Sequence, residues 1–255
     1  MSFRYDLTAA GILKLLGYAE PVGKDALLQA QQEKNIKLPP VLFEFLSLAA
    51  DSPLFKTADI WTDKLNVLYF SYDGIQEWID GDREYWEKEP WKYADNEYYQ
   101  LYKTPKEQWG ERVSNYLLIG SDYGAGIVKF GISLEEMGQE EPPVYMLIEE
   151  DSITDWKLYD EHLSDFLMRS LCDVLCCGEY DTAGRVLGKI GWVPEECCPE
   201  DIPALDMDAV LKYKSTYGAD AACGCAYDEE KNLLVCARVD KEDSGNRFMM
   251  AYRKE

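Results

Sequence analysis

The sequence predicts an α+β protein, because segments with helical periodicity alternate with segments typical of antiparallel strands. Residues 116–119 and 127–132 are two runs of β-forming residues, and the glycines between them supply the turn of a hairpin. Residues 158–177 carry apolar side chains at steps of three and four, as on one face of a helix, and Gly178 follows where such a helix is expected to end.

Two helices joined by an elbow are expected near the N-terminus. Residues 24–35 place small and apolar side chains on one side of a helix that ends at Asn35. Proline disfavours the helical conformation in the residue before it, so residues 36–38 are expected to be extended. Pro40 suits a first helical turn, and apolar residues at helical spacing follow it as far as Ala49.

The middle of the chain combines strands with a long irregular segment. Residues 66–72 are dense in β-forming residues and predict a strand, and a short helix is expected over 75–80. Residues 81–111 show no clean period and are interpreted as an insertion. Residues 142–151 predict a further strand that ends in acidic residues.

The C-terminal part is expected to begin with a connection and to end in strands. Residues 191–206 are rich in Pro, Cys and Glu, and a short helix is expected over 207–217. Residues 220–254 alternate strand-like runs with polar turns, which predicts two or three antiparallel strands.

Size and charge limit the classes of partner. A chain of 255 residues with 47% hydrophobic content can form one large or two modest domains. Its formal net charge of −22 repels phosphate backbones and anionic membranes, so neither nucleic acid nor a membrane is expected as a partner. The same charge attracts basic proteins and speeds their encounter. The alternative is that the charge serves solubility alone.

Cytoplasmic localisation is expected from the apolar pattern. No apolar run approaches the roughly 20 residues that cross a bilayer. Asp6 and Lys14 interrupt the apolar patch at the N-terminus, and no small-residue cleavage site follows it.

The cysteines are expected to be free thiols, since adjacent pairs suit a disulfide framework poorly and no secretion signal is seen. A zinc site that uses Cys223, Cys225 and a doublet is the alternative, but the usual two-residue gap between ligands is missing. No metal is therefore predicted. The eight cysteines are Cys172, Cys176, Cys177, Cys197, Cys198, Cys223, Cys225 and Cys236.

Residues 84–102 combine aromatic rings with acids in a way that suits neither a solvated linker nor a core. Rings bury a large area at small entropic cost, and binding hot spots are enriched in Tyr and Trp. Carboxylates beside them can pair with Lys or Arg of a partner. The alternative is that the rings pack inward and the acids simply face water. The predicted partner-binding residues are Asp80, Asp82, Glu84, Tyr85, Trp86, Glu87, Glu89, Trp91, Tyr93, Asp95, Glu97 and Tyr98.

No catalytic residue or cofactor site is predicted. His162 is the single histidine, and its position at a polar helix start indicates a capping or surface role. The glycines of residues 120–126 lack the Lys-Ser/Thr of a phosphate-binding loop and the helix that should follow it. Residues 149–151 are three adjacent acids, which alternate between the two faces of a strand and indicate a solvated strand end.

Several of these segments together resemble the SUKH superfamily, over about residues 20–177. The residues that carry the resemblance lie in the elbow, the hairpin and the late helix: Glu33, Ile36, Leu38, Pro39, Leu42, Phe45, Leu46, Leu118, Ile119, Gly120, Gly124, Gly126, Phe166 and Leu167. The resemblance implies helices packed on a central, mainly antiparallel sheet. Residues 1–177 would then form a SUKH-like domain with the insertion at 81–111, and residues 178–255 a C-terminal extension or small α+β subdomain.

Bacterial members of this superfamily often act as immunity proteins against secreted toxins, so the resemblance implies a function in protein binding. The expected partner is a cognate toxin, such as a basic nuclease, held through the acidic and aromatic surface. Two alternatives stay open. One is a regulatory or scaffold protein of the same fold without a toxin partner, and the other is a zinc or thiol enzyme that uses the late cysteines.

Overall fold

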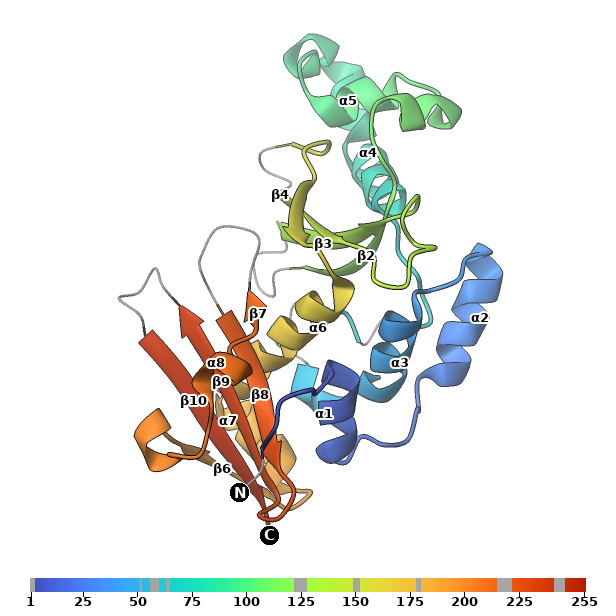
Figure 1. Ribbon diagram of the computed structural model, residues 1–255. Coiled ribbons are helices and arrows are strands. Elements are labelled where there is room, and N and C mark those ends of the chain that lie inside the picture. The colour runs from blue at the N-terminus through green and yellow to red at the C-terminus, as the bar shows by residue number, and fades with distance from the viewer. Residues whose placement is uncertain are drawn as a thin grey trace.

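The computed structural model describes residues 3–50, 52–55, 60–62, 65–121, 128–148, 152–177, 180–214, 222–240 and 246–255. Within these ranges the chain forms two antiparallel sheets with helices packed on them, which confirms the predicted α+β class (Figure 1). None of the helices in these ranges is long and apolar enough to cross a membrane.

The N-terminal helices form the predicted elbow. After helix α1 (Ala9–Leu15), helix α2 (Lys24–Lys34) ends at Asn35, which adopts a left-handed conformation with φ 51°. Helix α3 (Pro40–Ala49) begins at the second proline of the elbow, as predicted, and a short 3-10 turn, η1 (Pro53–Phe55), follows it.

The first sheet contains the predicted hairpin. Its strands are β2 (Tyr116–Ser121), β3 (Val128–Ser133), β4 (Val144–Ile148) and β5 (Lys157–Asp160), in that order. Residues 122–127, which include the turn glycines Gly124 and Gly126, lie outside the described residues, as do Glu149, Glu150 and Asp151.

The strand predicted over residues 66–72 is wrong. Phe70 makes a single antiparallel bridge to Leu117, and helix α4 (Ser71–Lys88) begins at the next residue. The Asp73 carboxylate accepts a hydrogen bond from the Phe70 amide at 3.1 Å and so caps this helix. The β propensity of residues 66–72 therefore did not decide their structure, because the capped start of α4 takes up the last two of them.

Helix α4 is much longer than the short helix predicted over 75–80. It takes up the first residues of the segment interpreted as an insertion, and it is followed by η2 (Pro90–Tyr93), helix α5 (Glu97–Tyr102) and η3 (Lys106–Glu111). Figure 1 shows α4 leading away from the first sheet, with α5 at its far end. Residues 71–111 are called the helical arm below.

The late helix predicted over 158–177 is confirmed in its central part. Residues 157–160 form strand β5 instead, helix α6 spans Leu163–Cys172, and a π-helical turn, η4 (Asp173–Cys177), continues it. Gly178, the predicted stop, lies outside the described residues. Helix α7 (Tyr180–Gly188) comes next.

The C-terminal strands form a second sheet and do not extend the first. Its order is β1-β8-β9-β10-β6, and β7 also pairs with β8. The strands are β1 (Phe3–Arg4), β6 (Trp192–Glu196), β7 (Tyr213–Lys214), β8 (Ala222–Asp228), β9 (Leu233–Asp240) and β10 (Asn246–Lys254). The N-terminal strand thus pairs with strands from the opposite end of the chain.

The helix predicted over 207–217 is confirmed only at its start, and residues 215–217 lie outside the described residues. Helix α8 covers only Met207–Val210, after a short 3-10 turn, η5 (Pro199–Asp201), and residues 213–214 belong to β7. Pairing with β8 offers these two residues backbone hydrogen bonds that a longer helix would forgo.

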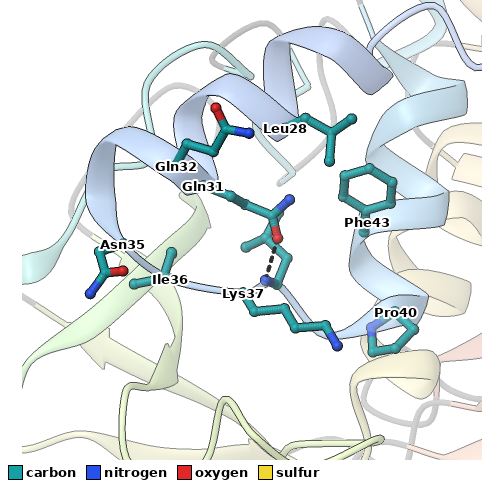
Figure 2. Close-up of a pocket in the computed structure, with 9 residues that line it drawn as sticks. Leu28, Gln31, Gln32, Asn35, Ile36, Lys37, Pro40 and Phe43 are labelled. Atoms are coloured by element: carbon teal, nitrogen blue, oxygen red, sulfur yellow. Dashed lines mark hydrogen bonds between the residues drawn. The ribbon is translucent and has the colours of Figure 1, made fainter.

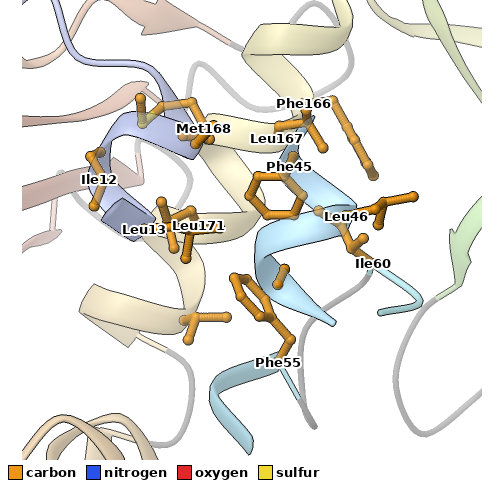
Figure 3. Close-up of a cluster of buried hydrophobic side chains, with 14 of the residues drawn as sticks. Ile12, Leu13, Phe45, Leu46, Phe55, Ile60, Phe166, Leu167, Met168 and Leu171 are labelled. Atoms are coloured by element: carbon orange, nitrogen blue, oxygen red, sulfur yellow. The ribbon is translucent and has the colours of Figure 1, made fainter. Parts of the chain in front are cut away.

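The largest hydrophobic cluster spans the two sides of the predicted domain boundary at residue 177. It includes Phe45 of α3, Leu171 of α6 and Tyr252 of β10, and each is fully buried. Figure 3 shows how side chains of α1, α3 and α6 converge in its centre. Each large side chain buried here contributes about 1.5–3 kcal/mol of stability. The boundary itself stays a prediction.

Candidate docking surface on the helical arm

The helical arm has a small hydrophobic core of its own. Ile75, Ile79 and Trp86 lie on one face of α4 and are buried against Tyr99 of α5 and Trp109 of η3. This stripe follows the three- and four-residue spacing of a helix, although the half-buried Asp82 takes the position between Ile79 and Trp86. The apolar stripe orients α4, and its remaining faces point to solvent.

Several of the predicted contact rings belong to this core and not to the surface. Trp86 is only 2% exposed, and its ring packs on Tyr93, Tyr99 and Tyr102 at centroid distances of 5.7–6.4 Å. The expectation that Trp86 contacts a partner is therefore not met in this conformation, because the ring lies seven residues after Ile79 on the buried face. Tyr93 and Tyr98 are half-buried against the same cluster.

Other rings of the arm face solvent. Tyr85 is 63% exposed and Trp91 is 71% exposed, as the predicted contact surface requires. Trp78, which was not among the predicted residues, is 52% exposed and stacks on Tyr98 at 5.4 Å. Its position seven residues before Tyr85, on the same side of a helix, is the signal that could have identified it.

Four exposed acids line another face of α4. Glu77, Asp80, Glu84 and Glu87 follow one another at steps of three, four and three residues, so they form one continuous row along the helix. We call these four residues the acidic stripe. Of the other predicted acids, Asp82 and Glu89 are half-buried and Asp95 is exposed.

The acidic stripe is partly engaged in surface interactions. Glu84 pairs with Lys88 at 2.6 Å, Glu87 accepts a hydrogen bond from the Tyr102 hydroxyl at 2.8 Å, and Gln76 donates to Asp80 at 3.1 Å. The bond to Glu87 raises the pKa of Tyr102. Such exposed interactions are worth little and exchange readily with those of a partner. Glu89 is likewise paired, with Lys92 at 2.5 Å.

Glu97 has a structural contact. Its carboxylate accepts hydrogen bonds from the Ile153 amide at 2.8 Å and from the Ser152 hydroxyl at 2.9 Å. These bonds attach the start of α5 to the connection between β4 and β5 of the first sheet. Among the predicted acids, Glu97 is thus the one whose removal disturbs the attachment of the arm.

A pocket lies where the helical arm meets the outer face of the first sheet. It has a volume of about 120 Å³. The arm contributes Glu77, Trp78 and Tyr98, and the sheet side contributes Lys129 and Trp156 among others. The pocket therefore has one residue of the acidic stripe, Glu77, and the exposed Trp78 in its wall, and a side chain of a partner could anchor here beside both.

A larger groove lies between α2 and α3 and has a different character. Figure 2 shows Leu28 and Phe43 on one side and Ile36 and Lys37 on the other. Its volume is about 700 Å³, and Lys37 is the one charged residue among those that line it. The Gln31 side chain is held by a hydrogen bond from the Leu38 amide at 2.6 Å. This groove has no carboxylate for a basic partner.

The part of the chain that the structure describes offers no arranged metal site. No cluster of three or more His, Cys, Asp or Glu in this part could hold a metal ion. His162 occupies the N-cap position of α6. Asp160 is buried and paired with Arg169 of α6, which holds β5 against this helix.

The fold and this surface define an α+β protein that presents acids and rings on a projecting helix. No model of a protein family, no curated protein and no solved structure matches the chain.

Proposed function

We propose that this chain is a SUKH-like immunity protein of the cytoplasm that neutralises a basic toxin domain by binding it. The observation that carries the proposal is the acidic stripe, four exposed carboxylates in one row on a helix that leads away from the body. The exposed rings of Trp78 and Tyr85 lie on a different side of the same helix and supply apolar contact area.

The architecture supports the family part of the proposal. The SUKH resemblance implied helices on a mainly antiparallel sheet, and α3 and α6 pack together beside the first sheet. The elbow residues Leu38 and Leu42 are buried, as is Phe166 of α6. These three residues act in packing, so they support the fold more than they indicate the partner.

The charge supports the choice of a basic partner. A net charge of −22 steers cations toward the chain, and the acidic stripe concentrates carboxylates at one place on the surface. A nuclease that binds nucleic acid carries a basic surface around its active site. An acidic helix that occupies this surface would exclude the nucleic acid, so inhibition requires binding alone and no catalysis by this chain.

The test uses the C-terminal toxin domain of a secreted protein encoded by a neighbouring gene, coexpressed with this chain and also purified for kinetics. The triple variant Asp80→Asn, Glu84→Gln, Glu87→Gln should lower the association rate constant about tenfold and weaken its salt dependence. The matched control is Glu140→Gln, Glu161→Gln, Glu230→Gln, which makes the same change in net charge at exposed sites away from the arm.

Coexpression of the wild-type chain should restore growth in cells that produce the toxin domain, and the control variant should do so equally well. If the two triple variants bind at the same rate, net charge alone accounts for the attraction and the arm is not the docking site. If the wild-type chain neither binds the toxin domain nor restores growth, the proposal fails.

A further inference from the structure

Five buried cysteines from three parts of the chain lie together in the largest hydrophobic cluster. Cys223 and Cys225 are two residues apart on β8 and share one face of this strand, which α6 covers. The other three are Cys172 of α6, Cys176 of η4 and Cys236 of β9. None of the five is more than 6% exposed. We call them the thiol cluster.

Cys225 lies at the centre of the thiol cluster. It is the direct cross-strand partner of Cys236, and the two sulfur atoms are 3.1 Å apart. On its other side the Cys172 sulfur lies 3.8 Å away. Directly opposed residues of antiparallel strands have Cα atoms about 4.5–5.5 Å apart, which is within the range that a disulfide spans.

We propose that Cys225 and Cys236 form a reversible redox site, which closes to a disulfide when a peroxide oxidises the protein, and that Cys172 is an alternative partner of Cys225. In the first step hydrogen peroxide converts one thiol to a sulfenic acid and releases one water. In the second step the neighbouring thiol attacks the sulfenic sulfur, the S–S bond forms and a second water leaves. A small dithiol reverses the reaction by thiol–disulfide exchange.

The surroundings favour reaction at Cys225. Burial raises the pKa of its thiol, but the hydrogen bonds that it shares with Cys172 and Cys236 oppose burial and lower the pKa below its usual value. The thiolate is the reactive form of cysteine. Peroxide is small and uncharged, so local opening of the sheet admits it more readily than a bulky alkylating reagent.

Each disulfide would fasten a different pair of elements. The Cys225–Cys236 bond joins β8 to β9 within the second sheet, whereas the Cys172–Cys225 bond joins α6 to this sheet. Because α6 also packs against α3, the second bond would connect the second sheet to the N-terminal helices. Exchange between the two needs no other thiol, since Cys225 takes part in both.

The test maps disulfides in the full-length wild-type protein after treatment with hydrogen peroxide. Free thiols are alkylated under denaturing conditions, and the protein is digested with trypsin, which cleaves after Lys231 and so separates Cys225 from Cys236. We expect a linked pair of the peptides 215–231 and 232–238 in which Cys223 is alkylated, lighter by about 2 Da than the same two peptides with Cys223 alkylated and the other two thiols reduced. A dithiol reductant should abolish this pair.

Variants test the central position of Cys225. In Cys236→Ala the linked pair should instead join Cys225 to the peptide that carries Cys172, and the matched control Cys223→Ala should keep the Cys225–Cys236 bond. The proposal is overturned if peroxide oxidises the exposed Cys198 while Cys225 and Cys236 both stay free. It is equally overturned if the protein, purified without chelators, contains one equivalent of zinc. Both of these outcomes are read from the wild-type protein, so they do not depend on the variants folding.

Discussion

The Glu97 carboxylate accepts a hydrogen bond from the backbone amide of Ile153 at 2.8 Å, and through it the helical arm is fastened to the connection between β4 and β5 of the first sheet. Glu97 also belongs to the first turn of α5, where a negative charge is favourable. Glu97 therefore stabilises the fold, and the predicted contacts with a partner depend on the other acids of the arm.

Glu97→Ala should lower the free energy of unfolding by about 1–2 kcal/mol, because it leaves the Ile153 amide without this acceptor. The exposed Asp95 offers the matched control, and Asp95→Ala should stay within about 0.5 kcal/mol of wild type. Urea denaturation of both variants measures the difference. Equal stabilities would show that the contact does not hold the arm.

Trp86→Ala should destabilise the protein by about 3–5 kcal/mol, because it opens a cavity at the centre of the arm's core. Trp91→Ala removes the same side chain where it is 71% exposed and should change the stability by less than about 0.5 kcal/mol. Thermal and urea melts distinguish the two. A loss at Trp91 as large as that at Trp86 would contradict the assignment of core and surface rings.

Gly224→Ala should cost about 3 kcal/mol or more, since a Cβ atom at this position would lie 1.9 Å from the Val210 carbonyl oxygen. The backbone of β8 and the end of α8 would have to separate. Gly81→Ala is the control, because nothing lies within 4 Å of a Cβ atom there. It lies inside α4 and should stabilise the protein by about 0.5–1 kcal/mol. Denaturation midpoints should show a loss of stability for Gly224→Ala and a gain for Gly81→Ala.

Burial raises the pKa of Asp160 to about 7, against the opposing influence of the Arg169 guanidinium. In the unfolded chain the pKa of an aspartate is about 3.9. At a pH between these two pKa values, Asp160 is protonated in the folded state and ionised in the unfolded state. The contribution of Asp160 to stability is therefore fully present below about pH 4 and is lost as the pH rises toward about 7. The slope approaches about 1.4 kcal/mol per pH unit in this interval.

Asp160→Asn should remove this pH dependence, and Asp155→Asn, at an exposed aspartate, should retain it. Unfolding free energies measured from pH 4 to pH 8 give the comparison. The carboxyl chemical shifts of labelled aspartate provide a second measurement. A titration midpoint below pH 4 for Asp160 would contradict the raised pKa.

Elements defined by local pattern were predicted well. The end of α2 at Asn35, the start of α3 at Pro40 and the hairpin strands β2 and β3 depend on residues within a few positions, such as proline and β-branched runs. The α4 helix was missed for most of its length, because its buried stripe is sparse and its other faces are acidic and aromatic. Residues outside α4, on η2, α5 and η3 and in the β4–β5 connection, give Ile79 and Trp86 something to pack against.

The row of acids on α4 and the exposed rings of Tyr85 and Trp91 follow from composition and helical spacing once the helix is known. Composition and spacing do not show which rings turn inward, because a Trp side chain suits a core and a binding surface equally well. The position of Trp86 was decided by the packing of three separate segments of the arm.

By itself, the sequence determined the α+β class, the negative charge and most helix boundaries near the N-terminus, since each depends on composition or on neighbouring residues. Tertiary structure alone decided that β1 pairs with β8, that the C-terminal strands form a separate sheet and that Cys172, Cys225 and Cys236 meet. Contacts between distant residues depend on which buried faces fit together, and the short-range periodicity of the sequence does not predict that fit.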